Sequence, residues 1–162
     1  MAEQQAYGLQ DGEGEALWFF NSLVTLKASS EQTGGEFCLA EFVGRSDIAT
    51  PMHVQRDDPE TFYVLEGELT FFLDGGERVS ATAGSVLHVP AGVPHAFQVD
   101  SDVARWLDLT TPEQERFFRV VGEPAQAREL PPVEPPPMDK IMSVIDEFHI
   151  TILGPPPGRP PS

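Results

Sequence analysis

The chain has 162 residues, of which 40% are hydrophobic, and a formal net charge of −16 at pH 7. This length can bury a core as one domain without disulfides, and the hydrophobic content excludes a disordered chain. The negative charge argues against nucleic acid and anionic membranes as partners, because phosphate groups are bound by clusters of Lys and Arg.

The cellular compartment is indicated by what the sequence lacks. Cys38 is the single cysteine, so no internal disulfide can form, and its apolar neighbours predict a buried, inert thiol. Residues 1–15 are acidic and polar and lack the basic and apolar regions of a signal peptide. No apolar run approaches the length of a membrane span. We expect a cytoplasmic protein whose residues 1–15 form a flexible arm.

Residues 16–110 carry many short apolar and β-branched runs separated by turn signals. The sequence Asp74-Gly75-Gly76 between two apolar runs is a strong hairpin signal. Such regular spacing predicts an antiparallel sandwich or barrel rather than alternating strands and helices. The expected strands cover residues 16–29 (one or two strands), 36–43, 51–55, 60–65, 68–73, 78–82, 85–89, 95–99 and 103–109.

The last fifty residues have a different character. Thr111 is a good N-cap, Pro112 suits the first helical position and Gln114 the capping-box position, so a helix is expected up to Gly122. Residues 130–137 are Pro-rich and predict an extended linker. Helical spacing predicts a second helix over residues 138–148. We therefore expect a helical extension over residues 111–153 and a Pro-rich tail over residues 154–162.

Four polar side chains fall in two stretches of the strand-rich region. His53 and Gln55 are two residues apart, so they share one face of a strand. Glu60 shares one face of its expected strand with the apolar Phe62 and Val64, and a carboxylate buried on that face is costly without a partner. His95 follows a rigid turn between two prolines. Two imidazoles and one carboxylate suit a mid-row divalent metal with open positions for substrate, so a metal site is the leading hypothesis.

Other histidines and aromatic residues have simpler explanations. His88 lies in an expected strand, where packing is favoured, and His149 ends an expected helix, where a surface position is favoured. The larger aromatic residues are expected in the core, although some of them can also line a cavity and stack on an aromatic ligand. These residues are Phe62, Phe71, Phe72, Phe97 and Trp106.

The two stretches resemble the two sequence motifs of the cupins, in the expected order and spacing. The first motif is matched by His53, by the position of Gln55, and by Glu60 and Gly67; the second is matched by Gly84, Pro90, Gly92 and His95, with Val99 in place of its usual closing Asn. The likeness covers nearly the whole chain and is to bacterial single-domain cupins of the quercetin 2,3-dioxygenase-like group. It implies a double-stranded β-helix, or jelly-roll barrel, over residues 16–110 with two C-terminal helices, and a homodimer.

One position departs from the family pattern. The cupins usually have His where this chain has Gln55, and an amide oxygen is a weaker metal donor than imidazole. We expect His53, Glu60 and His95 to hold the ion, with Gln55 as a weak ligand or as the partner of a bound water. Iron, manganese, nickel, cobalt and zinc all remain open.

The resemblance implies a metal-dependent dioxygenase that acts on a flavonol-like or other enolic aromatic small molecule. Glu60 would then be the catalytic base that takes the hydroxyl proton of the substrate. Two alternatives remain open. One is a non-redox cupin cyclase or isomerase of polyketide-type substrates, and the other is a degenerate cupin that binds a small molecule without chemistry, which Gln55 favours.

Overall fold

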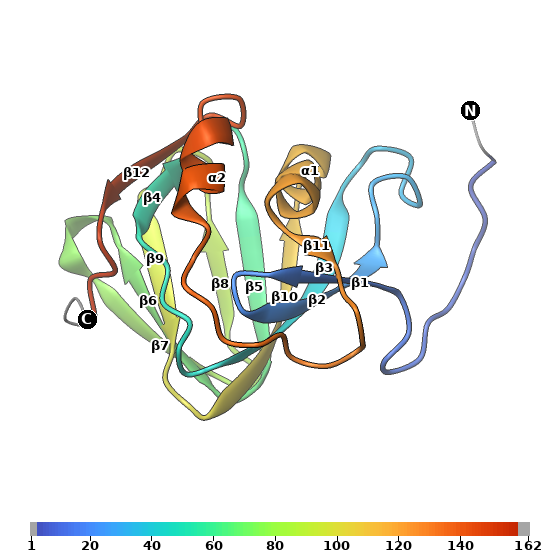
Figure 1. Ribbon diagram of the computed structural model, residues 1–162, viewed down its shortest axis with the longest axis horizontal. Helices are drawn as coiled ribbons and strands as arrows, with labels where there is room; N and C mark the ends of the chain where they lie inside the picture. Colours follow the sequence, from blue (N-terminus) through green and yellow to red (C-terminus); the bar gives the residue numbers. More distant parts are fainter. Residues whose placement is uncertain (1–2, 159–162) are drawn as a thin grey trace.

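The computed structural model describes residues 3–158 and contains two antiparallel β-sheets packed face to face (Figure 1). The seven-stranded sheet has the order β11-β1-β2-β3-β10-β5-β8, and the five-stranded sheet has the order β12-β4-β9-β6-β7. This is the jelly-roll barrel that the sequence predicted. The strands are β1 (Glu15–Phe19), β2 (Ser22–Ala28), β3 (Cys38–Arg45), β4 (Met52–Gln55), β5 (Glu60–Glu66), β6 (Glu68–Leu73), β7 (Arg78–Thr82), β8 (Val86–Val89), β9 (His95–Val99), β10 (Val103–Thr110), β11 (Glu123–Pro124) and β12 (Ile150–Gly154).

The strands alternate between a buried inner face and a more exposed outer face, as one-sided burial requires. In β10, Ala104, Trp106 and Asp108 are buried, whereas Val103 and Leu109 are exposed. The aromatic residues predicted for the core are buried or packed against it. Cys38 is fully buried, and burial raises the pKa of its thiol, in keeping with an inert residue.

Helix α1 (Pro112–Val121) begins and ends where the sequence predicted. The Thr111 side chain accepts a hydrogen bond from the Gln114 backbone N–H, and Gly122 is the C-cap. Helix α2 (Met138–Val144) is shorter than predicted: a turn follows it, and His149 has a left-handed backbone conformation with φ of 54°. The turn sends the chain back as β12, a strand that the sequence analysis did not predict.

The C-terminal segment therefore completes both sheets. Strand β11 pairs with β1, and β12 pairs with β4, opposite Gln55 and His53. The division into arm, barrel, extension and tail stays a prediction, and residues 159–162 of the tail lie outside the described residues. Residues 3–14 form no strand or helix, but Tyr7 donates a hydrogen bond to the Lys27 carbonyl, and the Lys27 ammonium donates to two carbonyls of this segment.

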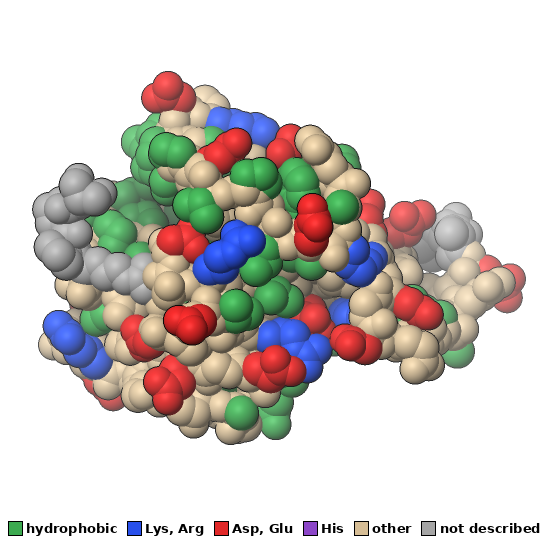
Figure 2. Space-filling model, turned by 60° about the horizontal axis from the view of Figure 1, so that its bottom comes forward, with side chains coloured by type: hydrophobic (Ala, Val, Ile, Leu, Met, Phe, Trp, Pro, Cys, Tyr) green, Lys and Arg blue, Asp and Glu red, His purple; other side chains and the backbone are tan. Residues whose placement is uncertain are grey.

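The outer surface is mixed in character. Acidic side chains are spread over the face in Figure 2, with basic and hydrophobic ones among them. On the seven-stranded sheet, Tyr63, Val86 and Leu109 are 42%, 60% and 42% exposed, so this outer face remains open in the monomer. The homodimer stays a prediction. Neither helix of residues 3–158 has the length and hydropathy of a membrane span.

Two motif glycines differ in how closely other atoms pack against them, although both have a left-handed backbone conformation. Gly67, between β5 and β6, and Gly84, before β8, have left-handed φ values of 84° and 90°. A Cβ on Gly67 would lie 2.6 Å from the Val103 carbonyl oxygen and 2.8 Å from the Ala104 Cα, whereas a Cβ on Gly84 would meet nothing within 4 Å.

We predict that Gly67→Ala destabilises the protein by roughly 3 kcal/mol or more, because a backbone clash adds to the left-handed strain. Gly84→Ala is the matched control and should cost only the strain, about 1–2 kcal/mol. Urea unfolding of both variants measures the difference. Equal destabilisation would contradict the role assigned to close packing at Gly67.

Candidate metal centre

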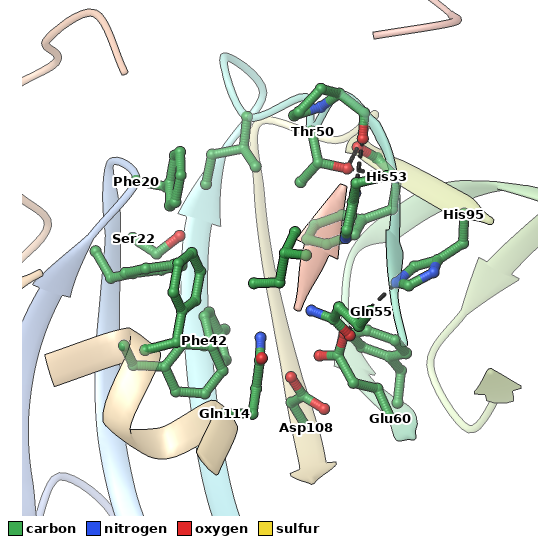
Figure 3. A pocket seen from close by; sticks show the side chains of 18 of the residues that line it. Phe20, Ser22, Phe42, Thr50, His53, Gln55, Glu60, His95, Asp108 and Gln114 are labelled. Carbon is green, nitrogen blue, oxygen red and sulfur yellow. Dashed lines mark hydrogen bonds and ion pairs between the residues drawn. The ribbon is translucent and has the colours of Figure 1, made fainter. Parts of the chain in front are cut away.

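Three side chains from three strands meet inside the barrel. His53 comes from β4, Glu60 from β5 and His95 from β9, and His53 and His95 are paired across neighbouring strands. One ligand atom from each lies within 4.8 Å of the others, and His95 Nε2 is 3.5 Å from Glu60 Oε1 (Figure 3). The structure thus brings together the three ligands that the sequence analysis selected.

Both imidazole rings are held by their other nitrogen. His53 Nδ1 lies 2.8 Å from the Pro51 carbonyl oxygen, and His95 Nδ1 lies 3.0 Å from the Val93 carbonyl oxygen. A carbonyl only accepts, so each Nδ1 carries the proton and donates it, which leaves Nε2 with a free lone pair in neutral imidazole. Such backbone contacts orient histidines that ligate metals. The rings are therefore set for coordination before any ion arrives.

The charges of the three groups also suit a cation. Burial, with the nearby His95, lowers the pKa of His53 to about 4, so this ring is neutral at pH 7. Burial would raise the pKa of Glu60, but hydrogen bonds with Asp108 and His95 outweigh it and lower that pKa to about 2. Burial would likewise lower the pKa of His95, but the hydrogen bond with Glu60 and its negative charge raise it. A proton on His95 and a bound cation therefore compete for Glu60.

Gln55 lies beside these ligands with its amide oxygen unused. The side chain is 4% exposed and lines the same cavity as His53, and its Oε1 has no hydrogen-bond partner among the described residues. An unpaired buried acceptor is costly, and a metal ion or a metal-bound water would satisfy it. The donor set of two imidazoles, a carboxylate and an amide oxygen thus fits a mid-row divalent ion.

Asp108 is a site residue that the sequence analysis missed. It lies on β10, is 2% exposed, and shares a hydrogen bond with Glu60. Burial and the charge of Glu60 raise the pKa of Asp108 well above its usual range, so Asp108 carries the proton of the pair. The burial of Asp108 could have been predicted from strand alternation. Asp108 is two residues after the core residue Trp106, so both side chains point to the inner face of the sheet.

The ligands open into a largely apolar cavity with a volume of about 110 Å³. Its lining includes the aromatic barrel residues Phe42, Phe62, Phe97 and Trp106. The C-terminal extension also lines it, through Gln114, Phe117, Phe118, Ile141, Ile150 and Ile152. The extension is therefore part of the site, and this apolar and aromatic lining suits an aromatic ligand.

Gln114 corrects one detail of the sequence analysis. Its backbone N–H is capped by Thr111, but its side-chain oxygen has no partner among the described residues and does not return the capping-box bond. The side chain points into the cavity instead (Figure 3). A Gln at this helix position can bond the N-cap residue or line a cavity. Only the packing of α1 on the barrel decides between the two roles.

The remaining histidines lie outside the site. His149 is exposed, as predicted, and pairs with Asp57. His88 was expected to be packed, which was wrong: it is exposed on the outer face of β8, with Nδ1 2.8 Å from Thr61 Oγ1. Its position is explained by alternation, since Leu87 and Val89 turn inward.

Comparison with known proteins agrees with this fold and site. A family model described as "Cupin domain" matches residues 44–110, which include all four candidate ligands. Over 152 residues the chain is 31% identical to a quercetin 2,3-dioxygenase of Bacillus subtilis (strain 168). That alignment covers 92% of this chain but 44% of the relative, so the chain spans less than half of the length of that protein.

Solved structures show the same fold at lower identity. A predicted oxalate decarboxylase from Thermotoga maritima has a TM-score of 0.59 and 18% identity, covering 65% of this chain and 98% of its own. The polyketide cyclase RemF from Streptomyces resistomycificus has a TM-score of 0.58 and 18% identity, covering 90% of this chain and 97% of its own.

The β-sandwich, the convergent ligands and the matched motifs define a cupin. Within the cupins, the chain belongs to the group that is similar to bacterial quercetin 2,3-dioxygenases. The sequence-based assignment to this family and fold is thereby confirmed.

We predict that metal affinity depends on pH through one proton. Metal binding needs the free lone pair of His95, whose pKa is raised by Glu60, whereas His53 stays neutral down to about pH 4. Apparent affinity should therefore be level above the raised pKa of His95 and fall about tenfold per pH unit below it.

Chelator competition with Zn²⁺ between pH 5 and 8 measures this slope. His88→Ala removes an exposed histidine and should leave the profile unchanged. A slope of two protons per ion above pH 5 would contradict the lowered pKa of His53.

Proposed function

We propose that the protein is a metal-dependent dioxygenase that acts on a flavonol-like or other enolic aromatic small molecule. The observation that carries this proposal is the convergence of Glu60 with two histidines, His53 and His95, that backbone carbonyls orient, in the lining of a cavity rich in aromatic residues. Similarity to a quercetin 2,3-dioxygenase supports the substrate class.

Each of the four candidate ligands would have its own role in this reaction. His53 and His95 would hold the ion through Nε2, Glu60 through a carboxylate oxygen, and Gln55 would add a weak oxygen donor or bind a water. When bound, the metal would act as a Lewis acid and lower the pKa of the substrate hydroxyl group. Glu60 is ionised and would take the hydroxyl proton. The resulting electron-rich enolate would then react with dioxygen.

The cavity walls favour this substrate class. The rings of Phe42 and Trp106 stack at a centroid distance of 5.5 Å, and Phe97 meets Trp106 edge-on at 5.6 Å. All three rings line the cavity, so an aromatic substrate would meet aromatic faces and edges and leave water behind. Burial of the site also strengthens the interactions of Glu60 with a developing charge, because the local dielectric is low.

We predict that Glu60→Gln abolishes turnover, lowering it by at least about a hundredfold, because the amide cannot accept the substrate proton. Glu66→Gln is the matched control, since Glu66 lies on the same strand, is exposed and pairs with Arg105. Oxygen uptake with flavonols, measured beside metal content, is the readout. Full activity of Glu60→Gln with bound metal would contradict the role of Glu60 as base.

A non-redox cyclase or isomerase is the second candidate. It is favoured by the pairing of Glu60 with the protonated Asp108, because a proton acceptor and a proton donor side by side suit a proton shift within one substrate. Such an enzyme consumes no dioxygen. Product formation from a polyketide-type enol without oxygen uptake would therefore favour it over the dioxygenase.

A substitution at Gln55 distinguishes an active enzyme from a degenerate cupin that only binds a small molecule. We predict that Gln55→His raises metal affinity at least about tenfold, since imidazole replaces a weaker amide oxygen. If the present site is tuned for catalysis, the same change lowers turnover. New activity in Gln55→His, from a wild-type protein that only binds, would instead identify a decayed site. Metal titration and oxygen uptake on the two proteins measure both effects.

A further inference from the structure

A second polar group lines the cavity, next to the metal ligands. Asp108 on β10 and Gln114 in the first turn of α1 are 2% and 3% exposed. Both side chains point into the cavity on the side away from His53 (Figure 3). Asp108 Oδ1 and Gln114 Oε1 have no hydrogen-bond partner among the described residues.

The fold does not use these two oxygens. Thr111 already caps the start of α1 through the backbone N–H of Gln114, so the amide of Gln114 has no part in the cap. Asp108 shares a hydrogen bond with Glu60, and its Oδ1 receives no hydrogen bond from an N–H or O–H group of the described residues. A buried unpaired polar atom costs about 1–3 kcal/mol. Two such atoms in one apolar cavity therefore indicate a polar group of the ligand.

The donor and acceptor pattern specifies that group. Asp108 Oδ1 and Gln114 Oε1 both accept, and the Gln114 amide nitrogen donates. A hydroxyl group both donates and accepts, so it satisfies this pair better than a carbonyl or a carboxylate does. Because Asp108 bonds the metal ligand Glu60, the hydroxyl must lie close to the metal-binding end of the substrate.

We propose that Asp108 and Gln114 form a subsite for a second hydroxyl group of the substrate, carried on the same ring system as the oxygen that binds the metal. The proposal rests on the proposed function, since it presumes an enolic aromatic ligand at the metal. It adds that the preferred flavonol-like compounds carry a hydroxyl group on the fused ring system.

The test is binding without turnover. Protein loaded with one equivalent of Co²⁺ is titrated anaerobically with 3-hydroxyflavone and with its 5-hydroxy, 7-hydroxy and 4′-hydroxy derivatives. The 7-hydroxyl lies on the far edge of the fused rings and the 4′-hydroxyl on the separate phenyl ring, so these two derivatives serve as the control compounds. The proteins are wild type, Gln114→Leu and Gln98→Leu. Gln98 is the matched control because its amide oxygen is also buried and unpaired, but it lies outside the cavity lining.

The 5-hydroxy derivative, whose added hydroxyl lies next to the metal-binding oxygens, should bind wild type and Gln98→Leu roughly ten to a hundred times more tightly than 3-hydroxyflavone does. Gln114→Leu should remove this gain while binding 3-hydroxyflavone and Co²⁺ nearly as wild type does. The native Co²⁺ content of Gln114→Leu also shows that the variant is folded at the site.

Three results would overturn the subsite. They are no gain from the 5-hydroxyl, an equal or larger gain from the 7-hydroxyl or the 4′-hydroxyl, or a gain that survives in Gln114→Leu. In each case 3-hydroxyflavone still binds the wild-type protein, so the proposed function stands. If loaded wild type binds none of the four compounds, the proposed function fails and the subsite fails with it.

Discussion

The site depends on keeping the Glu60 carboxylate ionised inside an apolar barrel. An isolated buried charge is too costly to persist, and such a group normally takes up a proton instead. Here a proton on Asp108 and, when His95 is protonated, its imidazolium stabilise the charge from two sides, which lowers the pKa of Glu60 to about 2. A bound cation would do the same more strongly. The arrangement therefore stores a negative charge at the point where a metal is expected.

Backbone geometry fixes what surrounds that charge. The Pro51 and Val93 carbonyls hold the two imidazoles through Nδ1, and each carbonyl lies two residues before its histidine. Strand β4 is in turn braced by β12 on one edge and by β9 on the other. The C-terminal segment thus supports the strand that carries His53 and Gln55, and it also supplies part of the cavity lining. Loss of this segment would alter ligand geometry as well as substrate access.

The sequence predicted most of the barrel because its turns and alternation are local signals. Strands β6, β7 and β9 were predicted with their observed bounds, and the motif positions placed His53, Glu60 and His95 together. Strand β12 was missed because its run is short and apolar, and its partner β4 lies about a hundred residues earlier in the chain. No local pattern records such a pairing.

The polar residues that were missed share a different cause. Asp108 and Gln114 belong to elements that were predicted correctly, but their exposure is decided by packing between elements. An Asp in a strand and a Gln after a cap are ordinary at a surface, and no residue type marks either of them as buried. The inward alternation with Trp106 was the available signal for Asp108, whereas nothing local reports the direction of Gln114.

The unpaired oxygens of Gln55, Asp108 and Gln114 indicate that the cavity has two polar regions that can bind polar atoms of a ligand. Each unpaired oxygen costs the free protein about 1–3 kcal/mol, so an apolar residue in place of Gln55 or Gln114 would stabilise the fold. Asp108 differs, because it is also the hydrogen-bond partner of Glu60. Gln55 lies beside the two histidines, and Asp108 and Gln114 lie beyond Glu60 on the other side. Glu60 is thus shared by both groups, as a candidate metal ligand and as the partner of Asp108. A substrate oxygen bound beside Gln55 or beside Asp108 would change the surroundings of the Glu60 carboxylate. Substrate binding would thereby affect the pKa of Glu60 at the metal site.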